Sequence, residues 1–194
     1  MTTGTQKEKP QISKNAALIV VDVQEGFDDP KFAAFRNNPL ADQNIEAIVK
    51  VWQREGRPIV VVQHNSESSA EVLHPSKPGN SLKQYVKVLK PALAISKSVN
   101  SAFYGAPDLD QWLKASGIKQ IVIIGIQTNM CCETTARMGG NLGYDVIFIP
   151  DAMHTFDAVG PDGVVVTADE LTRATVASLY DGEFAKIYYT ADLI

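Results

Sequence analysis

Short runs of valine and isoleucine alternate with amphipathic segments along nearly the whole chain, and this alternation constrains the fold more than any other feature. Each apolar run is short and ends in polar, glycine or proline residues, which is typical of a buried strand. The runs lie at residues 16–23, 57–64, 93–98, 119–126, 144–152 and 185–190. The segments between them have helical spacing and mostly close with glycine, and they lie at residues 40–56, 108–117, 129–143 and 171–184.

Strands and helices in alternation predict an α/β fold, because neighbouring parallel strands must be joined by crossover connections. We expect a three-layer α/β/α architecture with a six-stranded, mostly parallel, Rossmann-like sheet. The 194 residues are 45% hydrophobic and show no break in composition, so a single core is expected. The predicted organisation is a flexible N-terminal tail over residues 1–14, followed by one domain over residues 15–194.

The charge pattern favours a small molecule as the partner. The net charge is -4, from 18 basic and 22 acidic residues, and no basic run is present that would attract nucleic acid or an anionic membrane. The N-terminus lacks the apolar stretch of a signal peptide, and no later run reaches the roughly 20 apolar residues of a membrane span. We therefore expect a cytoplasmic protein that binds neither nucleic acid nor membranes.

The only two cysteines, Cys131 and Cys132, are adjacent. They could be a redox pair, half of a metal site, two core residues, or one nucleophile beside a neighbour. A disulfide between them is disfavoured, because a trans peptide holds their Cα atoms about 3.8 Å apart and relaxed disulfides use roughly 4.4 Å or more. The chain also lacks the Cys-x-x-Cys spacing of thioredoxin-like and zinc-ribbon sites.

Polar residues directly follow the apolar runs, at the carboxyl ends of strands where ligands of such sheets bind. Taken singly, each has an ordinary explanation: Asp22 could cap a turn, Lys97 could be a solvated surface residue, and a buried cysteine more often packs in a core. Together they offer a carboxylate, a cation and a nucleophile at one rim. The residues in these positions are Asp22, Gln63, His64, Lys97, residues 127–132 and Asp151.

A cysteine at the start of a helix could be activated as a nucleophile. Thr128 and Asn129 are good N-cap residues, which predicts a helix that begins near Met130 or Cys131. The positive end of that helix and a nearby lysine would lower the pKa of the thiol, and the thiolate is the reactive form. An adjacent carboxylate could take the thiol proton and return it to a leaving amine.

Three stretches also resemble the isochorismatase-like cysteine hydrolases, a family that includes nicotinamidases, N-carbamoylsarcosine amidohydrolase, ureidoacrylate amidohydrolase and streptothricin hydrolase. The stretches are ALIVVDVQEGF, KSVNSAFYGAPDLDQWL and IVIIGIQTNMCCETTARMGGNLGYDVIFIPDA, in the order and spacing of the family. The resemblance covers residues 16–190. It implies hydrolysis of a C–N bond in a small amide, cyclic amide or carbamoyl compound, through a covalent thioester-type intermediate.

By the same resemblance, Asp22 is the base and proton shuttle, Lys97 holds the thiolate and orients the carboxylate, and Cys131 is the nucleophile. Cys132 stands where relatives usually carry valine. Adjacent helical residues point about 100° apart, so both thiols cannot face one pocket. The pair is therefore interpreted as one nucleophile, Cys131, and one core thiol, Cys132.

The resemblance further implies a cis peptide bond between Ile126 and Gln127. This bond would turn the backbone N–H of Gln127 toward the same point as that of Cys131, which makes these two groups the predicted oxyanion hole. The residues predicted to bind substrate are Phe27, Phe103, Gln24 and His64, although a lone phenylalanine is more often a core residue.

Departures from the family bear mainly on metal binding. Nicotinamidases use an Asp-x-His pair with a second histidine, but here Val62 and Gln63 precede His64. No metal and no cofactor are expected, and a weaker site made by His64 and His74 is the alternative. His154 is interpreted as a surface or loop-bonding residue. True isochorismatases lack the nucleophilic cysteine, so Cys131 favours amide chemistry.

Other functional classes fit the sequence less well. A phosphatase with an aspartate nucleophile would need a second aspartate where Gln24 stands, and a dinucleotide-binding fold would need more glycines after the first strand. A thiol redox sensor or small-ligand binder that uses Cys131 stays open as the alternative. Loops near residues 32–36, 64–78 and 155–165 would set the substrate. Relatives commonly form dimers, tetramers or larger assemblies, so a homo-oligomer is expected.

Overall fold

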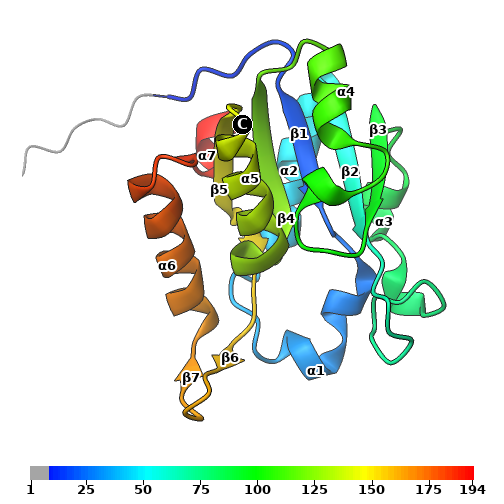
Figure 1. Ribbon diagram of the computed structural model, residues 1–194, viewed down its shortest axis with the longest axis vertical. Helices are drawn as coiled ribbons and strands as arrows, with labels where there is room; N and C mark the ends of the chain where they lie inside the picture. The colour runs from blue at the N-terminus through cyan, green and yellow to red at the C-terminus, as the bar shows by residue number, and fades with distance from the viewer. Residues whose placement is uncertain (1–8) are drawn as a thin grey trace, which may run out of the picture.

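The structure, a computed structural model, describes residues 9–194 apart from the side chains of residues 31 and 32. Its centre is a six-stranded sheet in the order β3-β2-β1-β4-β5-β8, in which every neighbouring pair is parallel (Figure 1). The predicted six-stranded parallel sheet is therefore confirmed. The strands are β1 (Ala17–Val21), β2 (Ile59–His64), β3 (Leu93–Lys97), β4 (Gln120–Ile126), β5 (Asp145–His154) and β8 (Lys186–Ile187).

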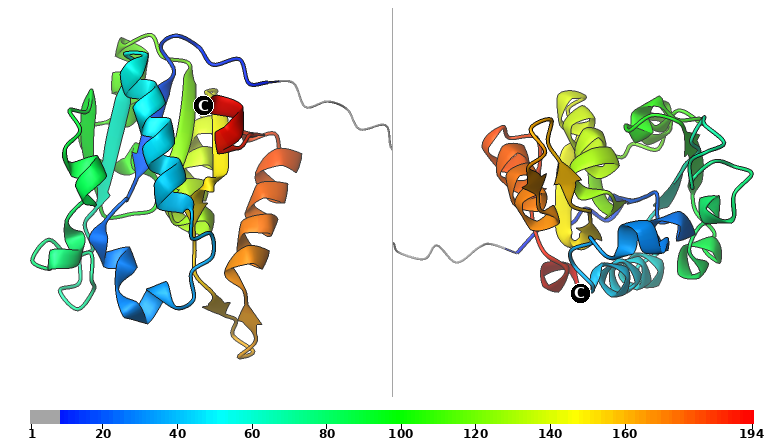
Figure 2. Two further views of the ribbon diagram at one scale, coloured as in Figure 1. Left: turned by 180° about the vertical axis from the view of Figure 1, so that it is seen from behind. Right: turned by 90° about the horizontal axis from the view of Figure 1, so that it is seen from below.

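Helices cover both faces of the sheet, which gives the three layers that the alternation predicts (Figure 2). On one face lie α2 (Ala41–Arg54), α3 (Gln84–Lys87) and α7 (Thr190–Leu193). On the other face lie α4 (Leu109–Ala115), α5 (Glu133–Asn141) and α6 (Ala168–Asp181). The single turn α1 (Pro30–Ala33) follows the first strand and its loop. The short helices α1, α3 and α7 are too brief to show helical periodicity in the sequence.

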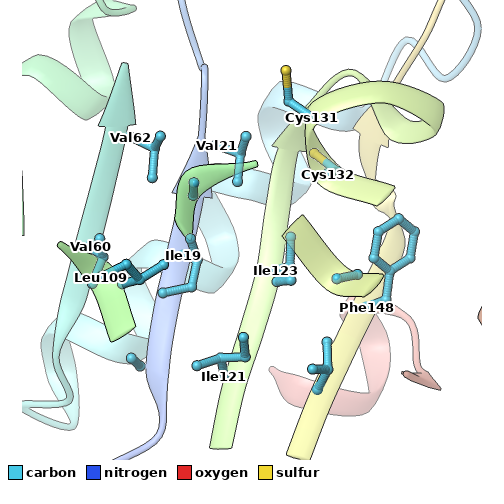
Figure 3. Packing of buried hydrophobic residues seen from close by; sticks show 14 of the residues in the cluster. Ile19, Val21, Val60, Val62, Leu109, Ile121, Ile123, Cys131, Cys132 and Phe148 are labelled. Carbon is cyan, nitrogen blue, oxygen red and sulfur yellow. The ribbon is translucent and has the colours of Figure 1, made fainter. Parts of the chain in front are cut away.

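Two large apolar clusters, one on each face of the sheet, form most of the core, and a third, smaller cluster contains Phe27, Leu73, Ile126 and Phe156. Successive side chains of a strand point to opposite faces. Ile19 and Val21 of β1 accordingly join the cluster under α4, α5 and α6, whereas Leu18 and Val20 join the cluster under α2. Figure 3 shows the first cluster, with the strands contributing alternate residues. Burial on both faces explains why the strands are nearly continuous runs of valine and isoleucine.

The order of the strands places a topological switch beside β1. From β1 the chain runs outward through β2 and β3, and it then returns to add β4 on the opposite side of β1. The loops that follow β1 and β4 therefore diverge from one point at the carboxyl end of the sheet. In open α/β sheets this is where ligands bind.

Part of the predicted N-terminal tail is held against the domain. The backbone N–H of Ser13 donates to the Oε1 atom of Gln120 (2.8 Å), and the Nε2 atom of Gln120 donates to the carbonyl of Gln11 (3.0 Å). Ile12 packs against the core. The ordered domain thus begins before residue 15, and the rest of the predicted tail, residues 1–8, lies outside the described residues.

The segment predicted as a loop at residues 155–165 contains a small antiparallel ribbon of β6 (Ala158–Val159) and β7 (Val165–Val166). The ribbon lies apart from the main sheet, at the end of the molecule where α1 also lies (Figure 1). Its two strands are two residues each, too short for a periodic signal. Within residues 9–194, no helix combines the length and the hydropathy that a bilayer span requires.

A substitution at Gly125 tests how closely β4 approaches β1. It pairs with Val21 in the register of the two strands, its φ angle is +131°, and an added Cβ atom would collide with the carbonyl group of Val21. Replacement of Gly125 by alanine should lower the free energy of unfolding by about 3 kcal/mol or more, because backbone strain and steric overlap add. Urea denaturation monitored by circular dichroism measures the change.

Gly117 provides the matched control for this prediction. Its φ angle is also positive, at +63°, but no atom lies near the position of its missing Cβ. Gly117→Ala should therefore cost only the strain of a left-handed residue, roughly 1–2 kcal/mol. Equal losses in the two variants would show that the contact between Gly125 and Val21 contributes nothing.

Candidate active site

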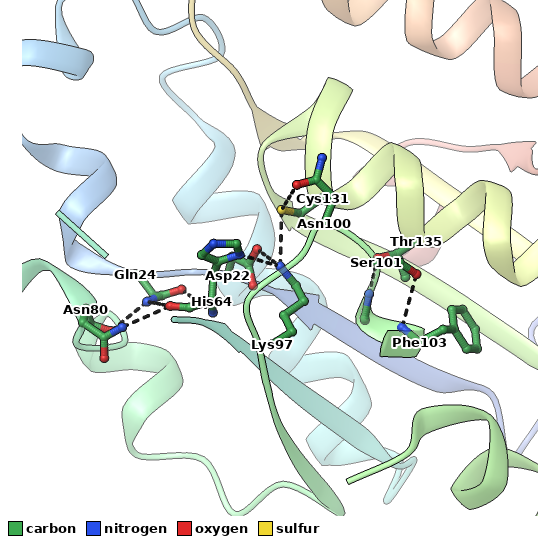
Figure 4. Close-up of polar contacts among 11 residues, drawn as sticks. Asp22, Gln24, His64, Asn80, Lys97, Asn100, Ser101, Phe103, Cys131 and Thr135 are labelled. Atoms are coloured by element: carbon green, nitrogen blue, oxygen red, sulfur yellow. Dashed lines mark hydrogen bonds and ion pairs between the residues drawn. The ribbon is translucent and has the colours of Figure 1, made fainter. Parts of the chain in front are cut away.

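The side chains of Asp22, Lys97 and Cys131 meet at the carboxyl end of the sheet (Figure 4). Asp22 directly follows β1, Lys97 is the last residue of β3, and Cys131 lies in the turn after β4. The Nζ atom of Lys97 lies 2.7 Å from Oδ2 of Asp22 and 3.3 Å from Sγ of Cys131. Their exposed fractions are 0%, 4% and 8%, so a charged pair and a thiol share a space that is almost closed to water.

His64, the last residue of β2, completes the contacts of the lysine. Its Nδ1 atom lies 3.0 Å from Nζ of Lys97. An ammonium group has three hydrogens to donate. Asp22, His64 and Cys131 therefore use all three donors of Lys97.

Cys131 is presented by a wide helical turn, η4 (Thr128–Cys132), that continues directly into α5. The carbonyl of Gln127 accepts from the backbone N–H groups of both Met130 and Cys132, at 3.2 Å each, and the second of these is a π-type bond. The predicted start near Met130 or Cys131 is thus corrected. The turn begins at Thr128, with Gln127 rather than Thr128 or Asn129 in the N-cap position.

The two cysteines face different surroundings. Cys132 is fully buried in the apolar cluster with Ile123 and Phe148, whereas Cys131 lies beyond the end of β4 (Figure 3). Both thiols are free. The peptide bond between Ile126 and Gln127 is cis, at the position that the sequence resemblance implied.

A cavity of about 540 Å³ opens above these groups. Asp22, His64 and Cys131 are among the residues that line it. Its apolar lining includes Phe27, Val72, Leu73 and Met130. A larger hollow of about 1020 Å³ runs along α6 and β8, but it contains none of the predicted site residues. The predicted catalytic residues therefore lie at the smaller cavity.

The electrostatics of the site differ from the predicted low-pKa thiol. Burial, followed by the negative charge of Asp22, raises the pKa of Cys131 to about 12, and the ammonium of Lys97 only partly opposes this rise. The predicted lowering of the thiol pKa is therefore wrong in direction, chiefly because burial disfavours the charged thiolate. At neutral pH the resting thiol of Cys131 is protonated.

The carboxylate beside this thiol is placed to accept its proton. Burial raises the pKa of Asp22, although the charge and hydrogen bond of Lys97 oppose it. Burial lowers the pKa of Lys97, but attraction to Asp22 and Cys131 outweighs this and leaves the pKa raised. The second carboxylate oxygen of Asp22, Oδ1, is buried and has no hydrogen-bond partner within residues 9–194. Lys97 is therefore a permanent cation, and Oδ1 of Asp22 is available to take a proton.

Of the two phenylalanines predicted to wall the pocket, only Phe27 lines the cavity, where it stacks on Phe156 at a centroid distance of 6.1 Å. Phe103 stacks on Tyr144 at 5.8 Å and packs against the core cluster under α4 and α5. It does not line the cavity. This placement corrects the prediction for Phe103, because its ring packs on Tyr144 and the core instead of facing the cavity.

Gln24 and Asp151 also support the backbone rather than the cavity. The Nε2 atom of Gln24 donates to the carbonyls of Asn80 (2.8 Å) and His64 (3.0 Å), while its Oε1 atom accepts from the N–H of His64 (2.8 Å). Asp151 accepts from the backbone and side chain of Thr190 at the start of α7. The prediction that Gln24 binds substrate is corrected, because its polar atoms are used in fixing the end of β2.

The Nδ1 atoms of the two histidines of the alternative metal site are both engaged by other side chains. Nδ1 of His74 pairs with the side chain of Ser76, whereas Nδ1 of His64 faces Lys97. Donor atoms of Asp22, His64 and Cys131 do lie within 4.8 Å of one another, a spacing that could hold a metal. The ammonium of Lys97 contacts all three residues, so the cation of this cluster is the lysine itself.

His154 is neither at the surface nor bonded to a loop, which corrects its interpretation. It is fully buried, and within the described chain neither ring nitrogen has a hydrogen-bond partner. Its ring meets the edges of Phe27 (6.5 Å) and Phe156 (5.3 Å). Burial lowers its pKa to about 3, so His154 is a neutral core residue below the cavity wall.

The cavity lining also includes Ser66 and Glu71, which lie in the loop of residues 64–78 that was expected to set the substrate, and Asn100, which was not predicted. The Oδ1 atom of Asn100 lies 4.0 Å from Sγ of Cys131. All three lie outside the helices and strands, where periodicity carries no information. A signal for Asn100 was available, since it follows the strand-ending Lys97 by three positions.

Comparison with known proteins identifies similar chains. The sequence matches the isochorismatase domain over residues 16–178. It is 38% identical over 183 residues to YrdC of Bacillus subtilis strain 168, an uncharacterized isochorismatase family protein, with 94% of this chain and 96% of YrdC covered. It is 29% identical to nicotinamidase 3 of Arabidopsis thaliana, with 92% and 86% covered. A crystal structure of an isochorismatase-family hydrolase from Chromobacterium violaceum superposes with a TM-score of 0.88 at 31% identity, with 96% of each chain covered.

The buried pair of Lys97 and Asp22 predicts a pH-dependent stability. Replacement of Lys97 by methionine should destabilise the protein by about 3–5 kcal/mol near neutral pH, because it leaves a buried carboxylate without its cation. Burial raises the pKa of Asp22 in the folded state, so the folded chain holds this proton above the ordinary pKa of 3.8 while the unfolded chain has lost it. The stability of Lys97→Met should therefore fall as pH rises, by up to about 1.4 kcal/mol per pH unit.

Urea denaturation across the pH range tests this prediction against the double variant Asp22→Asn with Lys97→Met. Asparagine tolerates the left-handed conformation of residue 22, whose φ angle is 50°. The double variant has no carboxyl group at position 22, so the fall of stability with rising pH that Asp22 causes should disappear. If the stability of the double variant falls with rising pH as steeply as that of Lys97→Met, Asp22 is excluded as the source of the effect.

Proposed function

The chain belongs to the isochorismatase family, and on that premise we propose that it is a cysteine hydrolase that cleaves the C–N bond of a small amide, cyclic amide or carbamoyl compound. The observation that carries the proposal is the contact of one buried ammonium with both a carboxylate and a thiol at the end of a cavity. An ammonium that contacts both groups can hold the nucleophile and its base side by side in a space from which water is excluded. Cys131 is the nucleophile, Asp22 the proton shuttle and Lys97 the cation.

Proton transfer and attack occur together in this mechanism. With its pKa raised to about 12, the resting Cys131 thiol is neutral. As Sγ of Cys131 forms its bond to the carbonyl carbon, the thiol proton moves to Oδ1 of Asp22 and the carbonyl electron pair moves to oxygen. Lys97 keeps its three protons and stabilises the negative charge that develops near it.

The oxyanion of the tetrahedral intermediate would be received by backbone N–H groups. Gln127 and Cys131 are the proposed donors, since Gln127 is the N-cap of the wide turn that holds Cys131 and both residues line the cavity. Loss of one such donor typically costs about 10²- to 10³-fold in rate. The side chain of Gln127 contacts Thr155, which supports a fixed position for this residue.

The second half of the reaction restores the site. As the C–N bond breaks, Asp22 gives its proton to the departing nitrogen, and a thioester to Cys131 is left. Water then attacks the thioester carbon and gives a proton to Asp22. When the C–S bond breaks, that proton returns to the sulfur, and the products are an acid and an amine or ammonia.

The alternative, a reversible thiol sensor, has less support. Sensor cysteines combine a low pKa with exposure to solvent. Cys131 has a raised pKa and an exposed fraction of 8%. These properties suit a nucleophile that is activated by its neighbour only when a substrate is bound.

Variants of the two cysteines and of Asp22 test the assigned roles. Cys131→Ala and Asp22→Asn should each lower turnover by on the order of 10³-fold or more, because the members of a catalytic unit fail together. Cys132→Val should keep most of the activity, since its side chain packs in the apolar core. Ammonia or amine release from a panel of small amides, ureas and lactams measures turnover.

Circular dichroism and melting curves of each variant provide the control for folding. An inactive but folded Cys132→Val together with an active Cys131→Ala would reverse the assignment of the two thiols. Reaction of Cys131 with peroxide, without turnover of any compound in the panel, would favour the sensor.

A further inference from the structure

The ring of His64 is fixed in one protonation state by Lys97. An ammonium group has no lone pair, so the contact of 3.0 Å between Nζ of Lys97 and Nδ1 of His64 requires Nδ1 to accept. A doubly protonated imidazole cannot accept, and a neutral ring that accepts at Nδ1 carries its proton at Nε2. Burial and the charge of Lys97 also lower the pKa of His64, which agrees with a neutral ring.

The position of His64 is fixed by its backbone as well. Gln24 binds both the N–H and the carbonyl of His64, and the side chain of Asn80 donates to the same carbonyl at 3.0 Å. The side chain of His64 lines the cavity, and one of its ring nitrogens lies within 4.8 Å of Sγ of Cys131. The Nε2–H group is therefore a donor with a fixed protonation state on a side chain that lines the cavity.

The charges around the cavity disfavour an anion. Asp22 is paired with Lys97, so the exposed Glu71 is the remaining negative charge of the lining, while none of the residues that line the cavity, all within the described chain, is an arginine or a lysine. The nearby Lys97 has already committed its three hydrogens. A carboxylate that entered the cavity would lose water without gaining a free cation.

We propose that His64 Nε2–H binds a hydrogen-bond acceptor adjacent to the carbon that Cys131 attacks, and that the site takes uncharged amides in preference to carboxylates. This inference rests on the proposed function, because it names the class of substrate that the same site accepts. His64 is thus a positioning residue for the substrate. Its side chain takes no part in the transfer of the thiol proton.

Two alkylating reagents of nearly equal size test the inference without knowledge of the natural substrate. Iodoacetamide is neutral and carries a carbonyl acceptor next to the carbon that the thiol attacks, whereas iodoacetate is an anion. The rate of alkylation of Cys131 by each reagent is measured in a Cys132→Val background, in which Cys131 is the single thiol of the chain. N-acetylcysteine provides the intrinsic ratio of the two rates.

The ratio of the iodoacetamide rate to the iodoacetate rate should be about tenfold or more higher for Cys131 than for N-acetylcysteine. His64→Leu should lower the iodoacetamide rate by about 2- to 10-fold, the range for loss of one hydrogen bond, and should change the iodoacetate rate less. His64→Gln, which can place an amide N–H near the position of Nε2, should restore most of the iodoacetamide rate. Glu71→Gln should raise the iodoacetate rate.

Either of two results would overturn the inference while amide hydrolysis by the protein still stands. One is a ratio no higher than that of N-acetylcysteine. The other is an equal loss of both rates in His64→Leu, which is expected if His64 only supports Lys97. Failure of both reagents to label Cys131 would also overturn the proposed nucleophile, so the two hypotheses fail in distinguishable ways.

Discussion

One buried ammonium group organises the whole site. Lys97 contributes its three hydrogens to a carboxylate, an imidazole and a thiol, and these come from the ends of three different strands or their loops. A charge in this position is tolerated only because it is paired and hydrogen-bonded. The strand order β3-β2-β1-β4 makes the pairing possible. Neighbouring strands lie about 4.8 Å apart, so the long side chain of Lys97 can reach from β3 past β2 to Asp22 after β1.

The same pairing changes how the thiol must work. Because Lys97 is neutralised by Asp22, its charge is not free to hold Cys131 as a thiolate, and burial raises the thiol pKa instead. Reactivity then depends on the transfer of a proton over a short distance when a carbonyl is present. The nucleophile is thus protonated until a substrate binds, and His64, which accepts from Lys97 at Nδ1, keeps its proton at Nε2 on a side chain that lines the cavity.

Sequence patterns predicted the sheet and the chemical residues well, and the side-chain directions poorly. Valine and isoleucine runs marked all six strands of the main sheet, and the residues that follow them included Asp22, Lys97 and Cys131. Phe103 and Gln24 were predicted to face substrate, but one packs on Tyr144 and the other binds backbone groups. Periodicity is a local property, whereas the direction of a loop side chain depends on elements far away in sequence.

The sequence by itself determined that a parallel α/β sheet forms and which residue types stand at the ends of its strands, because burial on both faces requires apolar runs and the strand ends are where those runs stop. Only the tertiary structure decided that Lys97 is shared among three partners, that burial raises the pKa of the Cys131 thiol, and that Nδ1 of His64 faces Lys97. Each of these depends on distances between segments about 30 or more positions apart, and those distances are fixed only when the strands pair and water is excluded.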